Sequence, residues 1–174
     1  MTTLGNQSVE RFLEAVASDA PAPGGGSSAA VGAALAAALV EMSARLAGCA
    51  DGVSAVGELR RRALKLAEEE LTSYAPVLAA RTDEERSAAL AAASEAPVRV
   101  AELAADVAEL GLDVAASSSP AVRGDALTGV ALAEAAAAAA ARLVEINLGS
   151  GPLLKRARQA EQRAARARSS AAAG

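Results

Sequence analysis

The sequence predicts an all-α protein, an up-and-down bundle of about five to six antiparallel helices. Two observations support this fold class. First, β-branched residues are scattered and form no alternating run of useful length, so strand signals are nearly absent. Second, long segments with helical periodicity are separated by short breaks rich in Gly, Pro and Ser. Long helices joined by short loops pack as antiparallel neighbours.

A first helix is expected over residues 7–18, where apolar side chains recur at helical spacing, at Val9, Phe12, Leu13 and Val16. The segment Pro21-Ala22-Pro23-Gly24-Gly25-Gly26-Ser27 ends it, because proline and consecutive glycines oppose helix. Ser27 or Ser28 is then expected to cap a second helix that ends before Gly48. The first half of this second helix contains only small residues, so another helix can lie very close to it.

A third helix is expected from Gly52 to about residue 80, with a kink or an end at Pro76 and with Val56, Leu59 and Leu66 facing inward. The segment Thr82-Asp83-Glu84-Glu85 has the pattern of a capping box and predicts the start of another helix. That helix is expected to continue to about residue 116, with a kink at Pro97.

A fifth helix is expected from residue 121 or 125 to residue 148, where Gly149-Ser150-Gly151 ends it. Pro152 suits the first turn of a basic terminal helix. We therefore expect a helical-bundle domain over residues 1–151 and a basic helix or tail over residues 152–174. The simplest interpretation of the basic segment is a solvated terminal helix; the alternatives are an arm that docks on an acidic patch or binds an anionic ligand.

The composition limits how the protein is stabilised and what it binds. Of the 174 residues, 52% are hydrophobic and 1% aromatic, and much of the hydrophobic share is alanine. Alanine faces bury little area per residue, so we expect an oligomer, most simply a homodimer. The net charge of -4 argues against a nucleic-acid partner. No signal peptide or convincing membrane span is expected, so the sequence predicts a cytoplasmic protein without a membrane partner.

The absence of histidine excludes His-dependent triads and His-ligated zinc. With one cysteine, Cys49, no intramolecular disulfide is possible, and we expect neither a metal site nor a bound prosthetic group. Acid–base chemistry must then come from Asp, Glu, Lys, Tyr, the thiol or the backbone.

Four features are candidates for a functional site. The glycine loop precedes a helix N-terminus, so its free N–H groups would stabilise a carboxylate or phosphate; the alternative is a plain turn. Asp125 lies near a helix start and is either a general acid/base or a helix-dipole aspartate. Asn147 lies near the end of the same helix and either caps a chain reversal or contacts a ligand. The run Glu68–Glu70 is mostly solvated, with room for one carboxylate to point into the bundle.

These motifs resemble the cyclodeaminase/cyclohydrolase family, which comprises the formiminotetrahydrofolate cyclodeaminase domain and methenyltetrahydrofolate cyclohydrolases. The similarity covers roughly residues 4–150. The residues that carry it are Phe12-Leu13, the Pro21 to Ser27 segment, the alanine-rich stretch to Met42, Ala96-Pro97, Gly124-Asp125-Ala126 and Ile146-Asn147-Leu148.

The resemblance implies a homodimer with a folate site near the subunit interface and a tetrahydrofolate derivative as substrate. It places Asp125 and Glu70 in proton transfer, without metal, in either hydrolysis of the methenyl bridge or cyclisation of a formimino group. It implies substrate contacts from Pro23, Gly24, Gly25, Gly26, Ser27, Arg81 and Asn147.

The chain departs from the family pattern at several positions. A lysine-rich stretch typical of the family is replaced by Gly48-Cys49-Ala50-Asp51-Gly52, which carries no positive charge. Tyr74 matches the family aromatic and Glu70 matches one acid of its acidic pair, whereas Ala75 replaces the expected second polar position. Arg81 is the only candidate for a further family cation. These losses are compatible with an alternative to the enzyme, a non-catalytic homologue that binds a small ligand or serves as a partner subunit.

Overall fold

A computed structural model describes residues 3–173, and within that range the chain is helical with no strand. The all-α prediction is therefore confirmed. A short 3-10 turn, η1 (Leu4–Asn6), comes first. The α-helices that follow are α1 (Val9–Val16), α2 (Gly25–Leu46), α3 (Ala50–Ser73), α4 (Ala75–Ala79), α5 (Asp83–Ala93), α6 (Glu95–Ser117), α7 (Pro120–Leu148) and α8 (Pro152–Ala173).

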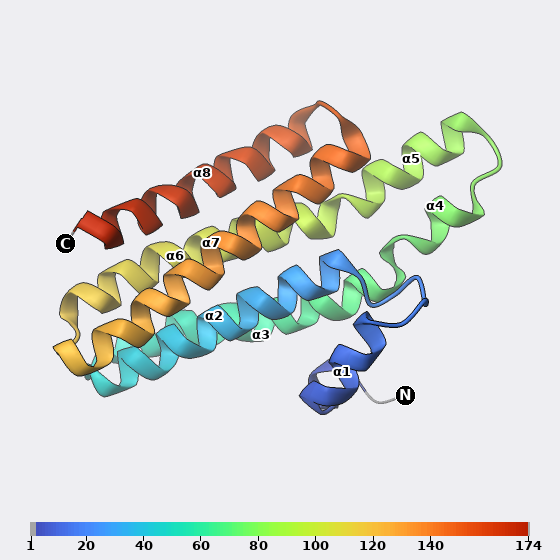
Figure 1. The fold of residues 1–174 in the computed structure, drawn as a ribbon. Coiled ribbons are helices and arrows are strands. Elements are labelled where there is room, and N and C mark those ends of the chain that lie inside the picture. The colour runs from blue at the N-terminus through green and yellow to red at the C-terminus, as the bar shows by residue number, and fades with distance from the viewer. Residues whose placement is uncertain (1–2, 174) are drawn as a thin grey trace.

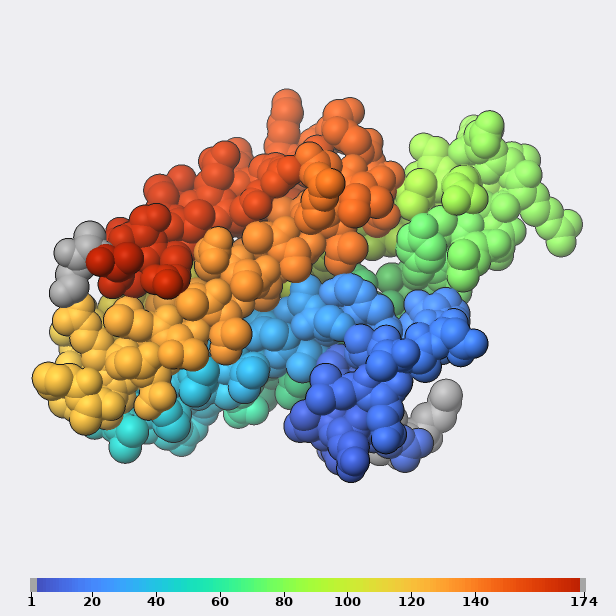
Figure 2. All heavy atoms as spheres, in the orientation of Figure 1, coloured from blue at the N-terminus to red at the C-terminus, as the bar shows by residue number. Residues whose placement is uncertain are grey.

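The five longest helices form the bundle, with α2 and α7 at its centre (Figure 1). Helix α2 packs against α3, α6 and α7, and α8 lies along α6 and α7. The short helices α4 and α5 form a hairpin that projects beyond one end of the bundle, and α1 lies beside that same end (Figures 1 and 2). The start of α2 and the end of α7 meet there, which positions the site described below.

Small residues allow the central helices to approach closely, as the sequence predicts. An ideal Cβ on Gly129 in α7 would lie 2.7 Å from Val40 Cγ2 and 3.0 Å from the Ala36 carbonyl oxygen of α2. An ideal Cβ on Gly111 in α6 would lie 2.8 Å from Val130 Cγ2. Such separations leave no room for a methyl group, so the bundle gains its density from backbone proximity rather than from large side chains.

Two predicted helix starts and stops differ from the structure. Helix α2 begins at Gly25 with Gly24 at the N-cap, and Ser27 is buried inside the first turn instead of capping it. The predicted helix from the capping box to residue 116 is two helices that meet at Ser94, three residues before Pro97. Pro97 has no N–H to donate to the Ala93 carbonyl, so the helix breaks one turn before the proline.

Other predictions from local sequence are confirmed. The Thr82 side chain and Glu85 form the capping box at the start of α5. Pro152 opens α8, and Gly149, at φ 66°, ends α7. Val56, Leu59 and Leu66 are buried, and the predicted third helix ends at Ser73, with Pro76 in the separate short helix α4.

Helix α8 is an integral part of the bundle, so the interpretation as a solvated terminal helix is wrong. One face of α8 is a buried alanine stripe: Ala157, Ala160, Ala164, Ala167 and Ala171. The other face carries arginines paired with acids of α6: Arg156 bonds Glu102, and Arg163 bonds Asp106 and Glu109. The basic segment therefore docks on an acidic patch of its own chain.

Helices α2 and α7 are long and apolar enough to cross a membrane by length and composition alone. Both are central helices of the bundle, with 56% of the apolar window of α2 and 44% of that of α7 buried inside the protein. Core helices of alanine-rich bundles have the same composition, so these two are weak evidence for a membrane span.

Candidate functional site

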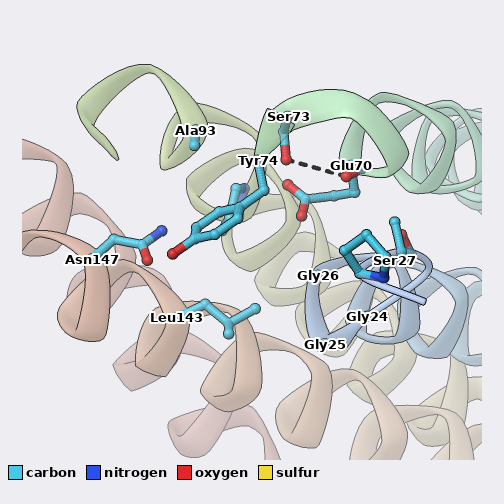
Figure 3. A pocket seen from close by; sticks show the side chains of 13 residues that line it. Gly24, Gly25, Gly26, Ser27, Glu70, Ser73, Tyr74, Ala93, Leu143 and Asn147 are labelled. Carbon is cyan, nitrogen blue, oxygen red and sulfur yellow. Dashed lines mark hydrogen bonds between the residues drawn. The ribbon is translucent and has the colours of Figure 1, made fainter. Parts of the chain in front are cut away.

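A cavity of about 160 Å³ lies at the end of the bundle where α2 begins (Figure 3). Four parts of the chain meet there: the first turn of α2, the end of α3, the α5–α6 junction and the end of α7. The lining residues are Pro21, Ala22, Gly24, Gly25, Gly26, Ser27, Glu70, Ser73, Tyr74, Ala93, Pro97, Leu143 and Asn147.

The glycine segment supplies an open helix N-terminus. Gly24 is the N-cap and has no side chain to cap the helix. The first intrahelical bond is donated by the Ser28 N–H to the Gly24 carbonyl, at 3.0 Å. The N–H groups of the first turn precede this bond and have no carbonyl partner within the helix. They form a region of positive potential at the edge of the cavity.

Gly26 lies directly against the carboxylate of Glu70 on α3. An ideal Cβ built on Gly26 would overlap both Oε2 and the carboxyl carbon of Glu70. An ideal Cβ on Gly25 would meet only Leu143, at 3.5 Å, an ordinary contact. Glycine at residue 26 is therefore what allows the acid to rest on the first turn of α2.

The three acids that end α3 have different surroundings. Glu68 accepts hydrogen bonds from the backbone of η1, at Leu4 and Gly5, and Glu69 forms an ion pair with Arg99 at 2.6 Å. Only Glu70 turns into the cavity. The expectation that one member of the run points inward is thus confirmed, and this member is Glu70, the acid that the family resemblance implies.

Glu70 is electrostatically unusual. Its Oε1 is buried and accepts no hydrogen bond from any residue that the structure describes. Burial raises the pKa of Glu70 to about 7, with Arg99 opposing the shift and Glu69 adding to it. A carboxyl group that titrates near neutrality can both take and release a proton at physiological pH.

The opposite wall of the cavity is formed by Tyr74 and Asn147. Figure 3 shows the Tyr74 ring between Glu70 and Asn147, with its hydroxyl pointing toward the Asn147 carboxamide. The Asn147 Nδ2 donates to the Ser94 hydroxyl at 3.3 Å. The sequence analysis did not identify Ser94. The available signal was its position three residues before Pro97, because the proline breaks the helix one turn earlier.

Three predicted site residues do not line this cavity. Asp125 is exposed near the start of α7, 22 residues before Asn147, which is about 33 Å along the helix. Pairing Asp125 with Glu70 in one site of one chain is therefore wrong. Arg81 is exposed between α4 and α5, where it lines a separate cavity of the hairpin. Pro23 joins Ala22 through a cis peptide bond just before the turn, but only its neighbours line the cavity.

A second cavity of about 200 Å³ shares Asn147 with the first and contains a cation that the sequence analysis passed over. It is lined by Asp83, Arg86, Ser87, Leu90, Asn147 and Leu148. Arg86 forms no ion pair with any other described residue, so its charge is free to meet an anion. Over residues 3–173, no cluster of three or more His, Cys, Asp or Glu side chains could hold a metal ion.

A sequence model of the formiminotransferase-cyclodeaminase family matches residues 8–168. The chain belongs to this family. Among curated proteins, the methenyltetrahydrofolate cyclohydrolase of Methylorubrum extorquens is 31% identical over 166 residues, which cover 82% of this chain and 80% of that protein. The family resemblance drawn from the sequence motifs is therefore confirmed.

The fold of the family is also found here. The crystal structure of formiminotetrahydrofolate cyclodeaminase from Thermotoga maritima superposes with a TM-score of 0.83, covering 96% of this chain and 92% of that one. At 24% identity this likeness shows a shared fold. The family match extends through most of α8, which agrees with the packing of α8 into the bundle.

Proposed function

We propose that this protein is a folate one-carbon enzyme of the methenyltetrahydrofolate cyclohydrolase or formiminotetrahydrofolate cyclodeaminase type. Membership of the family and the names of the two relatives support the substrate class. The observation that carries the proposal is the Glu70 carboxyl, which faces the cavity with a pKa of about 7 and an unpartnered oxygen.

In the cyclohydrolase reaction, the Glu70 carboxylate takes a proton from a water molecule as its oxygen bonds to the methenyl carbon. The resulting tetrahedral carbon is attached to both N5 and N10. Glu70 then returns the proton to N5 as the carbon–N5 bond breaks, and the hydroxyl proton leaves to solvent, which leaves a formyl group on N10. General acid–base catalysis of this kind contributes about 10² to 10⁴ in rate and needs a pKa near the working pH.

The cyclodeaminase reaction would use the same group. N10 attacks the formimino carbon and its proton passes to the formimino nitrogen, and protonated Glu70 supplies the further proton with which ammonia departs. Both reactions are served by one carboxyl group, without metal and without Asp125.

The remaining lining residues suit the rest of a folate. We propose that Tyr74 stacks on an aromatic ring of the substrate and that the first turn of α2 stabilises negative charge. The carboxylates of the glutamate tail would reach past Asn147 to Arg86 in the adjoining cavity. This arrangement supplies a cation in place of the absent family lysines.

The direct test follows the near-ultraviolet absorbance of methenyltetrahydrofolate with wild-type protein and with Glu70→Gln. We expect the wild type to accelerate its loss and the variant to be slower by at least about 10²-fold. Glu84→Gln, an exposed acid on α5, is the matched control and should retain the wild-type rate. If folded wild-type protein leaves the rate of methenyltetrahydrofolate hydrolysis at the buffer value, the cyclohydrolase proposal is refuted. Release of ammonia from formiminotetrahydrofolate tests the cyclodeaminase reaction.

One observation favours a second candidate, a non-catalytic folate-binding homologue. Glu70 is the only charged residue that lines the 160 Å³ cavity, so the cavity itself holds no cation. Under this alternative, 5-formyltetrahydrofolate raises the melting temperature without any turnover, because a ligand of the native state stabilises it.

We also propose that the protein is a cytoplasmic homodimer. Large apolar side chains are exposed on the single chain, at Val9 and Leu13 of α1 and at Leu35, Met42 and Leu46 of α2. A second copy covering these side chains would add the apolar burial that an alanine core lacks. Light scattering of the purified protein measures the mass, and a monomer at micromolar concentration would contradict the dimer.

A further inference from the structure

The carboxamide of Asn147 is held from one side by a fully buried serine. Ser94 is 0% exposed at the junction of α5 and α6. Its hydroxyl donates to the Leu90 carbonyl at 2.8 Å, and the Asn147 Nδ2 lies 3.3 Å from the same hydroxyl oxygen. The Ser94 hydroxyl oxygen therefore takes part in two contacts, one with a backbone carbonyl and one with a side-chain amide.

The hydroxyl has one proton, and that proton is directed at Leu90, the shorter of the two contacts. The Ser94 oxygen can then only accept from Asn147, and of the two ends of a carboxamide only the NH₂ group donates. The hydrogen-bond network thus assigns the nitrogen of Asn147 to the Ser94 side. The carboxamide oxygen must point away from Ser94.

We infer that Ser94 is a positioning residue that fixes the Asn147 carboxamide so that its oxygen faces the cavity as a hydrogen-bond acceptor. This inference rests on the proposed function and adds a specificity to it. The acceptor selects a substrate group that carries an N–H at this position. A carbonyl group there would face the Asn147 oxygen with a second acceptor, so neither oxygen would have a hydrogen-bond partner in the other.

The two ends of the cavity then differ in polarity. Glu70 and the first turn of α2 lie at one end, Asn147 lies at the other, and Tyr74 lies between them (Figure 3). The substrate would bind with an N–H group toward α7 and its one-carbon unit toward Glu70. Ser94 controls this orientation although it does not line the cavity itself.

The test compares two buried serines that share the same backbone bond. Ser43 is also 0% exposed, and its hydroxyl donates to the carbonyl four residues earlier, that of Leu39, at 2.9 Å. Among the described residues, no side chain hydrogen-bonds Ser43, so Ser43→Ala controls for the loss of a buried hydroxyl from a helix. We expect Ser94→Ala to raise the KM for methenyltetrahydrofolate about five- to tenfold with little change in kcat, and Ser43→Ala to leave both constants unchanged.

A double-mutant cycle with Asn147→Ala separates positioning from general destabilisation. If Ser94 acts through Asn147, the effect of Ser94→Ala on KM disappears in the Asn147→Ala background. If the effect persists unchanged there, the inference is overturned while the proposed function stands. If wild-type protein neither turns over nor binds the folate, the proposed function fails, and this specificity fails with it.

A spectroscopic readout tests the hydrogen bond without any folate. The chain has five carboxamide side chains, those of Asn6, Gln7, Asn147, Gln159 and Gln162, so the NH₂ region of a ¹⁵N spectrum is simple. The Asn147 pair, identified by its loss in Asn147→Ala, should move in Ser94→Ala and stay in place in Ser43→Ala. An unchanged Asn147 pair in Ser94→Ala would overturn the assignment of its nitrogen to Ser94.

Discussion

Replacing Glu70 by glutamine should change how the stability of the protein depends on pH. The pKa of Glu70 is raised by burial from 4.5 to about 7, so the native state holds this proton more tightly than the unfolded chain does. Between these two values the unfolded state binds fewer protons than the native state. The free energy of unfolding therefore decreases as the pH rises from about 5 to about 7, and the loss is complete above that range.

The size of the effect follows from the pKa difference. A change in the Glu70 pKa from 4.5 to about 7 corresponds to at most roughly 3 kcal/mol in the free energy of unfolding. Glu70 is only partly buried and solvent reaches the cavity, so we expect about 1–2 kcal/mol. Glu70→Gln cannot ionise, and its stability should stay level over the same interval.

Urea unfolding at pH 5 and pH 8, at one fixed protein concentration, measures this difference. Glu41, Glu109 and Glu145 have pKa values lowered by arginine partners, so their contributions change below pH 4.5 and do not overlap with the interval. Glu84→Gln should follow the wild type. A wild-type stability that stays level or increases from pH 5 to pH 8, or an equal slope in Glu70→Gln, would refute the reasoning.

Two further predictions follow from the contacts of the site. Gly26→Ala places a methyl group on the Glu70 carboxylate, and the Glu70 side chain can rotate into solvent, so the variant should still fold. It should lose about 10²-fold in kcat and show a Glu70 pKa nearer 4.5. Gly25→Ala should behave as wild type. Steady-state kinetics and a pH–rate profile check this pair, and equal activity of the two variants would contradict it. Arg86→Ala should raise the KM for a glutamate-bearing folate about three- to tenfold, while Arg81→Ala leaves this KM unchanged. Equal KM values in the two variants would exclude Arg86 as the cation that binds the glutamate tail.

Much of the fold was predictable because its signals are local. The capping box at Thr82 and the stops at Gly48 and Gly149 each act on the few residues around them, and each is found in the structure. The break at Ser94 was placed at Pro97 because the proline is visible in sequence, whereas its effect appears one turn earlier, at the carbonyl it cannot bond.

The site was predictable only as separate parts. The glycine turn, Glu70 and Asn147 were each recognised from the sequence, and the structure brings all three to one cavity. Asp125 and Asn147 were both assigned to the site, yet they lie near opposite ends of one helix of 29 residues, which separates them by nearly the length of the bundle.

By itself, the sequence determined the helical class, most helix boundaries and the family, because periodicity, caps and breakers are properties of short segments. The tertiary structure alone decided that Gly26 makes room for the Glu70 carboxylate and that α8 docks on the acids of α6. Those outcomes depend on which helix faces meet across the bundle. Helices built so largely of alanine carry little side-chain pattern to specify that pairing, so contacts between residues far apart in sequence had to be seen in three dimensions.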